Sequence, residues 1–147
     1  MSPDLSIVTC PHCGKKNRVS KSATGWPRCG HCREGLPWVV EVDDSSFSSA
    51  TGTSLLTLID LWAPWCGPCR LVAPVLERLA TTYAGQLKVV KVNVDESPRL
   101  ASKYQAMSIP MLVFERRGRV LETVVGAQPE QVLRQHVDQL LATHEGS

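Results

Sequence analysis

Residues 55–83 read Leu-Leu-Thr-Leu-Ile-Asp-Leu-Trp-Ala-Pro-Trp-Cys-Gly-Pro-Cys-Arg-Leu-Val-Ala-Pro-Val-Leu-Glu-Arg-Leu-Ala-Thr-Thr-Tyr, and this stretch decides the fold. Its first part, residues 55–61, is a near-continuous apolar run, which is typical of a central strand covered on both faces. From Cys66 to Tyr83 the large apolar residues recur at helical spacing, so we expect a helix with a kink at Pro74. The stretch therefore predicts a buried strand that leads directly into an amphipathic helix.

The remaining chain continues this alternation of strands and helices. A short helix is expected within 44–52, another is opened by Ser97-Pro98, and a last one follows Pro129. Further strands are expected at 39–43, 87–94, 111–115 and 120–125, with a hairpin turn at 116–119. Helices that alternate with strands imply a parallel core, and the hairpin adds an antiparallel edge, so the fold class is α/β.

Size and composition fit a globular chain. The 147 residues are 43% hydrophobic and 20% charged, enough for one domain with its own core plus a small stapled module. No apolar run approaches the roughly 20 residues of a membrane span. The first residues lack the basic region and long apolar stretch of a secretory signal, so we expect a cytoplasmic protein with reduced thiols.

Cys66-Gly67-Pro68-Cys69 stands at the predicted start of the helix. There the first cysteine faces free N–H groups and the positive end of the helix dipole, which favour its thiolate. Cys69 lies in the first turn, where it can reach Cys66 and resolve a mixed disulfide. Pro68 suits an early helical position, and Gly67 keeps the loop small. We expect Cys66 to attack disulfides and Cys69 to resolve them.

Two charged residues interrupt the apolar strands. Asp60 lies six residues before Cys66. Burial there would raise its pKa and make it a proton acceptor for Cys69, whereas the alternative is a solvated Asp at a strand end. Lys91 interrupts the Val-rich strand 87–94, and it either pairs with Asp60 or points to solvent.

Four further cysteines, Cys10, Cys13, Cys29 and Cys32, lie within residues 1–38. Their two Cys-x-x-Cys pairs are 15 residues apart, which is the spacing of two knuckles that close one tetrahedral Zn²⁺ site. The segment has few large aliphatic residues, and metal binding would supply the missing stability. Each pair could alternatively be a redox centre, but neither lies between a strong strand and an amphipathic helix. This context favours zinc.

The N-terminal segment is also basic. Residues 1–38 carry six Lys/Arg and two Asp/Glu, whereas residues 39–147 carry ten and twelve. Such a balance allows a nucleic-acid interface, but four zinc-bound thiolates would offset much of the positive charge. We therefore favour a metal site over nucleic-acid binding.

The nine residues from Trp62 to Arg70 closely resemble the active-site segment of the thioredoxin family. The similarity covers roughly residues 39–142 and includes Asp60, Pro74, Lys91-Val-Asn-Val-Asp95, Ile109-Pro110 and Val125-Gly126-Ala127. It implies a thioredoxin fold, with a central mixed sheet flanked by helices, in residues 39–147. A zinc ribbon in residues 1–38 ahead of such a domain is similar to the bacterial zinc-binding thioredoxin-2 subfamily, which implies zinc ligands at Cys10, Cys13, Cys29 and Cys32.

The same resemblance implies a protein disulfide reductase that receives electrons from NADPH through a thioredoxin reductase, without a bound organic cofactor. Asp60 and Lys91 would tune the buried cysteine. The implied substrate groove is bordered by Trp65, Gly67, Pro68, Ile109, Pro110 and Gly126, with Pro110 a cis-proline that faces the dithiol. Two residues depart from the family pattern: Met111 stands where thioredoxins usually have Thr, and Arg70 where many have Lys.

Three classes of function are compatible with these features. The first is a disulfide reductase for protein substrates. The second is a disulfide oxidase or isomerase, against which the Gly-Pro dipeptide and the expected cytosolic location both count. The third is a zinc-switched chaperone or adaptor that uses the thioredoxin fold for binding. We expect the first.

Overall fold

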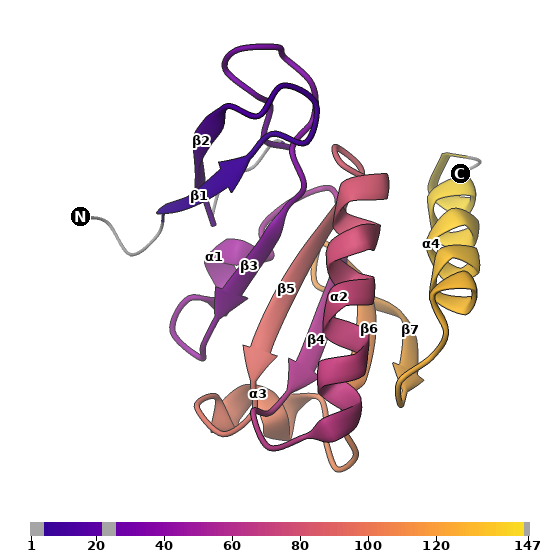
Figure 1. Ribbon diagram of the computed structural model, residues 1–147. Coiled ribbons are helices and arrows are strands. Elements are labelled where there is room, and N and C mark those ends of the chain that lie inside the picture. Colours follow the sequence, from indigo (N-terminus) through magenta and orange to yellow (C-terminus); the bar gives the residue numbers. More distant parts are fainter. Residues whose placement is uncertain (1–4, 22–25, 146–147) are drawn as a thin grey trace.

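The computed structural model describes residues 5–21 and 26–145 and contains the expected mixed sheet (Figure 1). Across the sheet the strands are β3 (Val39–Val42), β5 (Leu87–Asn93), β4 (Leu56–Trp62), β6 (Met111–Arg116) and β7 (Arg119–Val125). The first three run parallel, whereas β6 is antiparallel to β4 and β7 is antiparallel to β6. The expected parallel core and antiparallel hairpin edge are both present.

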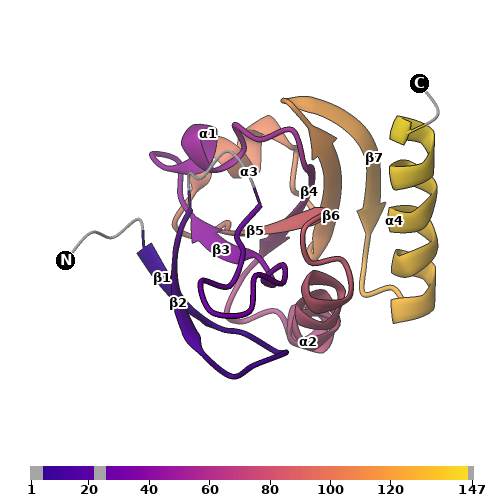
Figure 2. The ribbon, with the colours of Figure 1, turned by 90° about the horizontal axis from the view of Figure 1, so that it is seen from above.

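Helices cover both faces of the sheet (Figure 2). The helices α2 (Gly67–Thr82) and α4 (Glu130–Glu145) lie on one face, and the shorter α1 (Phe47–Ala50) and α3 (Pro98–Lys103) lie on the other. Each face has its own apolar cluster, one with residues of α2 and α4 and one with residues of α1 and α3. None of the described helices is long and apolar enough to cross a membrane.

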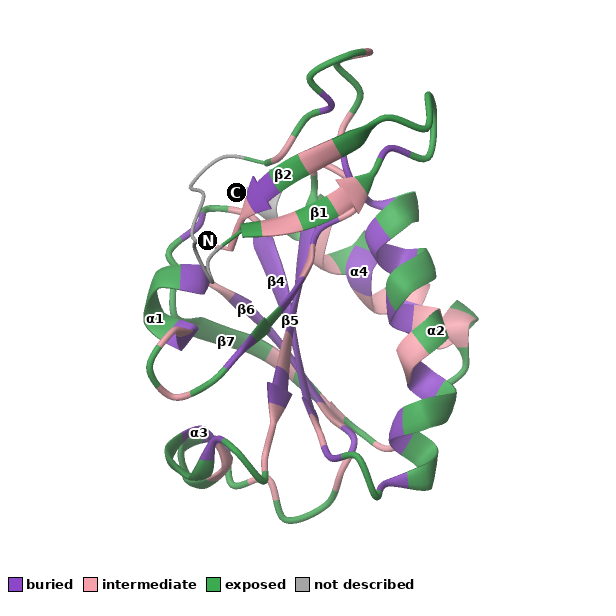
Figure 3. Ribbon diagram, turned by 60° about the vertical axis from the view of Figure 1, so that its left-hand side comes forward, coloured by how far each residue is buried: buried purple, intermediate pink, exposed green. Residues whose placement is uncertain are grey.

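Strand β4 lies at the centre of the sheet and is buried along most of its length (Figure 3). Successive side chains of a strand point to opposite faces. Leu56 and Leu58 accordingly belong to the cluster under α2, and Ile59 and Leu61 to the cluster under α1 and α3. Asp60 therefore points toward the α2 face, because it shares the parity of Leu58.

The N-terminal segment forms a hairpin that the sequence pattern does not predict. Strands β1 (Leu5–Thr9) and β2 (Lys16–Ser20) pair antiparallel, but β2 reads Lys-Asn-Arg-Val-Ser and lacks a strong apolar alternation. Val19 and Leu36 are buried in the same apolar cluster as α1 and α3. These two apolar residues of the segment thus pack with the sheet rather than in a separate core.

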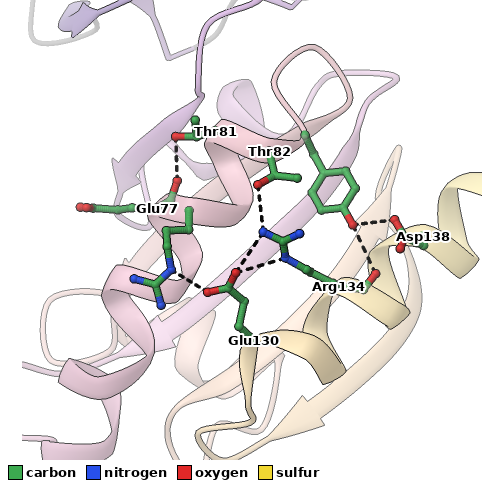
Figure 4. Close-up of polar contacts among 8 residues, drawn as sticks. Glu77, Thr81, Thr82, Glu130, Arg134 and Asp138 are labelled. Atoms are coloured by element: carbon green, nitrogen blue, oxygen red, sulfur yellow. Dashed lines mark hydrogen bonds and ion pairs between the residues drawn. The ribbon is translucent and has the colours of Figure 1, made fainter. Parts of the chain in front are cut away.

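Helix α4 is attached to α2 through apolar and polar contacts. Leu133 and Val137 are fully buried in the cluster that α2 shares. At the rim of this contact Glu130 accepts hydrogen bonds from Arg78 (2.6 Å) and Arg134 (3.1 Å), as Figure 4 shows for Glu130 and Arg134. The Tyr83 hydroxyl donates to Asp138 at 2.5 Å. These contacts fix α2, whose first residues carry the redox pair, on the sheet.

Candidate active site and metal centre

The redox pair lies at the N-terminus of α2, directly after β4. Cys66 is the N-cap residue, with an extended backbone (φ −86°, ψ 109°), and its sulfur accepts a hydrogen bond from the backbone N–H of Cys69 at 3.2 Å. Pro68 occupies one of the first helical positions, where no N–H is required. Arg70 donates to the carbonyl oxygen of Pro64 at 2.7 Å and closes the loop before the helix.

Cys66 and Cys69 are joined by a disulfide bond, with their Cα atoms 5.3 Å apart. Their exposed fractions are 4% and 3%, so exposure alone does not tell the attacking sulfur from the resolving one. Their positions do differ, because Cys66 is at the helix cap and Cys69 is inside the first turn.

A cis-proline loop faces the redox pair. The Ile109–Pro110 peptide bond is cis, and the Ile109 carbonyl oxygen lies 3.7 Å from the Cys66 sulfur. Gly126 donates its N–H to the carbonyl oxygen of Pro110 at 2.8 Å and adopts a φ of +95°, a conformation that favours glycine. The structure thus places Ile109 beside Cys66 and joins Pro110 to Gly126, which lies on a separate loop.

Trp65 marks the exposed side of the site. Its side chain is 68% exposed, and its indole N–H donates to the Asp95 carboxylate at 2.9 Å. The contact of Asp95 cannot be read from the sequence, because it joins residues 30 positions apart. Gly67 and Pro68 are also exposed, so an apolar ring and two small residues border the disulfide.

Asp60 is buried in the sheet without a polar partner. It is 1% exposed, and neither of its carboxylate oxygens has a hydrogen-bond partner. Burial raises the pKa of Asp60 to about 6, and the positive charge of Lys91 opposes this shift. The carboxyl group can therefore exchange a proton close to neutral pH, as expected for a proton acceptor.

Lys91 lies beside Asp60 in the register of β4 and β5 but does not touch it directly. No ion pair joins the two side chains in the described part of the chain, and the Lys91 Nζ lies 5.1 Å from the centre of the Trp62 ring. Lys91 thus acts on the Asp60 carboxylate through its electric field, without a direct ion pair. This arrangement lies between the two alternatives that the sequence leaves open, a direct pair and exposure to solvent.

The order of β4, the capped cysteine pair and the cis-proline loop is matched by known proteins. A family model described as thioredoxin matches residues 38–139. The chain belongs to the thioredoxin family. Thioredoxin 1 of Nostoc sp. is 46% identical over 102 residues, which are 69% of this chain and 95% of that protein. The thioredoxin of Staphylococcus aureus is 44% identical over 103 residues, 70% of this chain and 98% of that protein.

A plant relative extends this similarity. The chloroplastic M-type thioredoxin of Pisum sativum is 43% identical over 112 residues, 76% of this chain and 65% of that protein. The chain is therefore a thiol–disulfide oxidoreductase, with Cys66 and Cys69 as its active-site pair. The matched family region begins at residue 38, so the four N-terminal cysteines lie outside it.

These four cysteines form one cluster. The sulfur atoms of Cys10, Cys13, Cys29 and Cys32 all lie within 4.8 Å of one another, with 3.6 Å between Cys10 and Cys32 and 3.5 Å between Cys13 and Cys29. Four sulfurs at about 2.3 Å from a tetrahedral Zn²⁺ lie about 3.8 Å apart, so the donor set fits this ion.

The two knuckles of the cluster share one backbone pattern. Gly14 donates to the carbonyl of Cys10, and Arg33 donates to the carbonyl of Cys29, both at 2.9 Å. Gly14 has a φ of +79° and Arg33 a φ of +72°. The equivalence is not visible in the sequence, because the second knuckle has Arg33 at the position that Gly14 takes in the first.

The charges of the cluster favour a bound cation. Backbone N–H donation from Cys32 and His31 outweighs desolvation and lowers the pKa of Cys29 to about 5. The pKa of Cys32 is raised to about 12. Hydrogen-bond donation by the Glu34 N–H lowers this pKa, but desolvation and the three neighbouring cysteine sulfurs raise it by more. Several thiolates can therefore coexist at this spacing only when a positive ion compensates them.

Proposed function

We propose that this thioredoxin-family protein is a protein disulfide reductase in which Cys66 is the nucleophile and Cys69 the resolving thiol. The observation that carries the proposal is the position of Cys66 at the cap of α2, facing the cis-proline loop. Free N–H groups at a helix start favour a thiolate on the first cysteine of the reduced pair.

The reaction proceeds by two exchange steps. The Cys66 thiolate attacks a substrate disulfide, a Cys66–substrate disulfide forms, and one substrate sulfur leaves as a thiolate. Cys69 then gives its proton to Asp60 and attacks the Cys66 sulfur, which releases the second substrate thiolate. The pair ends as the Cys66–Cys69 disulfide, and two electrons have moved to the substrate. NADPH restores the dithiol through a thioredoxin reductase.

The groove for the substrate chain is formed by Trp65, Gly67, Pro68, Ile109, Pro110 and Gly126. Its support is the contact chain from Cys66 to the Ile109 carbonyl and from Pro110 to Gly126. Asp60 on β4 and Lys91 on β5 complete the site. The buried Asp60 carboxylate accepts the proton of Cys69, and the positive charge of Lys91 lowers the pKa of this carboxylate. Disulfide-containing proteins are the substrates.

Residues 1–38 form a zinc ribbon with Cys10, Cys13, Cys29 and Cys32 as ligands, and residues 39–147 form the thioredoxin domain. The sulfur cluster supports this division, as does the start of the family match at residue 38. The metal stabilises the N-terminal segment and takes no part in the exchange steps. The protein acts in the cytoplasm, where a thioredoxin reductase keeps the pair reduced.

Insulin reduction tests this function. The protein, supplied with dithiothreitol or with NADPH and a thioredoxin reductase, should precipitate the insulin B chain, and Cys66→Ser should abolish the reaction. Cys13→Ser is the matched control, since it removes a thiol outside the redox pair and should retain activity. A wild type that binds substrates without reducing them would instead indicate an adaptor or chaperone, and an oxidising potential of the Cys66–Cys69 pair would indicate an oxidase.

A further inference from the structure

A buried ammonium group connects the N-terminal segment to the sheet. Lys88, on β5, is fully buried, and its Nζ donates to the backbone carbonyls of Lys21 and Ala50, the latter at 2.6 Å. The same Nζ lies 3.9 Å from the centre of the Trp38 ring. Burial of a charge is costly unless such partners compensate it. Lys88 therefore fixes the backbone of Lys21 just after β2.

Lys21 also lines a pocket at the edge strand β3. The pocket has a volume of about 390 Å³ and is also lined by Glu41, Trp62 and Lys91. Trp62 is the next residue of β4 on the face of Asp60, and Lys91 is the register partner of Asp60 on β5. The N-terminal segment thus contributes a cation to the pocket that adjoins the buried carboxylate.

The strand register explains how a charge in this pocket acts on Asp60. Glu41 on β3, Lys91 on β5 and Asp60 on β4 are direct neighbours across three parallel strands. Register partners point to the same face, so the three side chains form a row from the exposed edge to the buried centre. A further charge at the exposed end of this row adds its own field to that of Lys91 at Asp60.

Without Lys21, the charged residues that line the pocket are mostly acidic. Among the pocket residues Glu41, Asp43 and Glu96 are acidic and only Lys91 and Lys21 are basic. The register partner of Asp60 on β6 is the apolar Leu112, which adds no charge. Removal of Lys21 therefore leaves Lys91 alone against three carboxylates.

We propose that Lys21 is a positioning residue of the redox reaction: anchored by Lys88, it places a second positive charge in the pocket beside Lys91 and stabilises the ionised form of Asp60. The inference rests on the proposed role of Asp60 as proton acceptor. It also gives the N-terminal segment a link to the active site, since any change that detaches the Lys21 backbone withdraws this charge.

The test is the Asp60 carboxyl titration followed by carbon NMR in the reduced full-length protein at low ionic strength. Lys21→Gln should raise the pKa of Asp60 by about 0.3, the effect of one charge across about 10 Å of solvent. Lys21→Arg keeps the charge and should restore the wild-type value. Lys16→Gln, in the same segment but outside the pocket, is the matched control and should change nothing.

A second variant addresses the anchor. Lys88→Met should raise the pKa of Asp60, as Lys21→Gln does, and the double variant should show no larger shift than the single variants. If Lys88→Met does not fold, the result for Lys21→Gln decides alone. An unchanged titration in Lys21→Gln, or an equal shift in Lys16→Gln, would overturn the inference. Insulin reduction by the same samples separates this result from a failure of the proposed function, because the titration does not depend on turnover.

Discussion

At the scale of single residues, Asp60 is an energetically unfavourable group in the folded protein. Its carboxylate is 1% exposed, lacks a hydrogen-bond partner and lies among apolar side chains of the sheet. Such a group destabilises the folded state whenever it is charged. Its presence is understandable if the protein uses the raised pKa for proton transfer with Cys69.

The first prediction concerns the stability of Asp60→Asn. The pKa of Asp60 is raised to about 6 in the folded protein, above its value in the unfolded chain. Between about pH 4 and 6 the folded protein therefore keeps a proton on Asp60 that the unfolded chain has lost. The destabilisation of the folded state by Asp60 develops in this range and is complete above about pH 6. Asp60→Asn should gain about 3 kcal/mol of unfolding free energy at pH 7 and little at pH 3.5.

Urea denaturation of both proteins across this pH range measures the gain. The same variant should reduce insulin more slowly, because Cys69 loses its proton acceptor. A gain of stability that does not vary with pH would show that the Asp60 pKa is not raised.

The second prediction uses the equivalence of the two knuckles. Arg33 and Gly14 occupy the same left-handed backbone position, which favours glycine. Arg33→Gly should therefore raise the free energy of unfolding by about 0.5–1 kcal/mol, after the greater chain entropy of glycine is subtracted. Gly14→Ala should lower it, although no atom lies within 4 Å of the added Cβ. Denaturant unfolding of both variants checks the signs, and equal effects would contradict the backbone explanation.

At the scale of the secondary-structure elements, the attachment of α4 to α2 rests on apolar burial more than on ion pairs. Leu133 is fully buried, whereas the Arg78 partner of Glu130 has a side chain that is 56% exposed. Leu133→Ala should lower the free energy of unfolding by about 3 kcal/mol. Glu130→Gln should cost much less, and its effect should shrink in high salt, because the ion pair is exposed to solvent.

Chemical denaturation at low and high salt distinguishes the two contributions. The matched pair lies on one helix, so both changes test the same contact. A larger loss from Glu130→Gln than from Leu133→Ala would show that the polar contacts, rather than the apolar ones, hold α4.

The five strands between residues 39 and 125 and helix α2 are predictable from the sequence to within one residue at each end, whereas α1 is shorter than the expected span 44–52. The strong apolar run before Asp60 and the Ser97-Pro98 start of α3 each carry a local signal. Strand β1 carries only a short β-branched signal at Ile7 and Val8, and β2 has no apolar alternation. The turn that joins these two strands holds the first knuckle. Long-range contacts such as Trp65 with Asp95 are likewise absent from any local pattern.

The polar residues of the site were predictable to different degrees. Cys66 and Cys69 follow from their spacing at a helix start, and Asp60 follows from its place in an apolar strand. Whether Lys91 touches Asp60 depends on side-chain geometry, and the sequence leaves this open. From the sequence, Lys88 resembles an ordinary exposed strand residue. The structure shows why it is buried, because the backbone carbonyls of Lys21 and Ala50 accept hydrogen bonds from its Nζ.

At the scale of the whole molecule, the four-cysteine cluster belongs to the main core. Cys10 and Cys29 are each 1% exposed and share an apolar cluster with Trp38 and the strand residue Val90. We predict one zinc per chain by mass spectrometry, with only Cys66 and Cys69 alkylated quickly in the reduced protein. Strong oxidation should convert the four thiolates to disulfides and release the metal.

Removal of the zinc by a chelator should lower the free energy of unfolding but leave basal insulin reduction intact, because the redox pair lies at α2 on a separately packed part of the sheet. A chain without zinc, or six thiols of equal reactivity, would contradict the metal site and make the N-terminal pairs candidate redox centres.

The most direct test of the central claim is mass spectrometry of a trapped reaction intermediate. Cys69→Ser cannot resolve a mixed disulfide, so after reaction with insulin it should carry a substrate chain bound to Cys66 through a single disulfide. Cys66→Ser should trap almost none under the same conditions. A substrate disulfide at any of the N-terminal cysteines in place of Cys66, or more trapping by Cys66→Ser than by Cys69→Ser, would contradict the assignment of Cys66 as the attacking thiol.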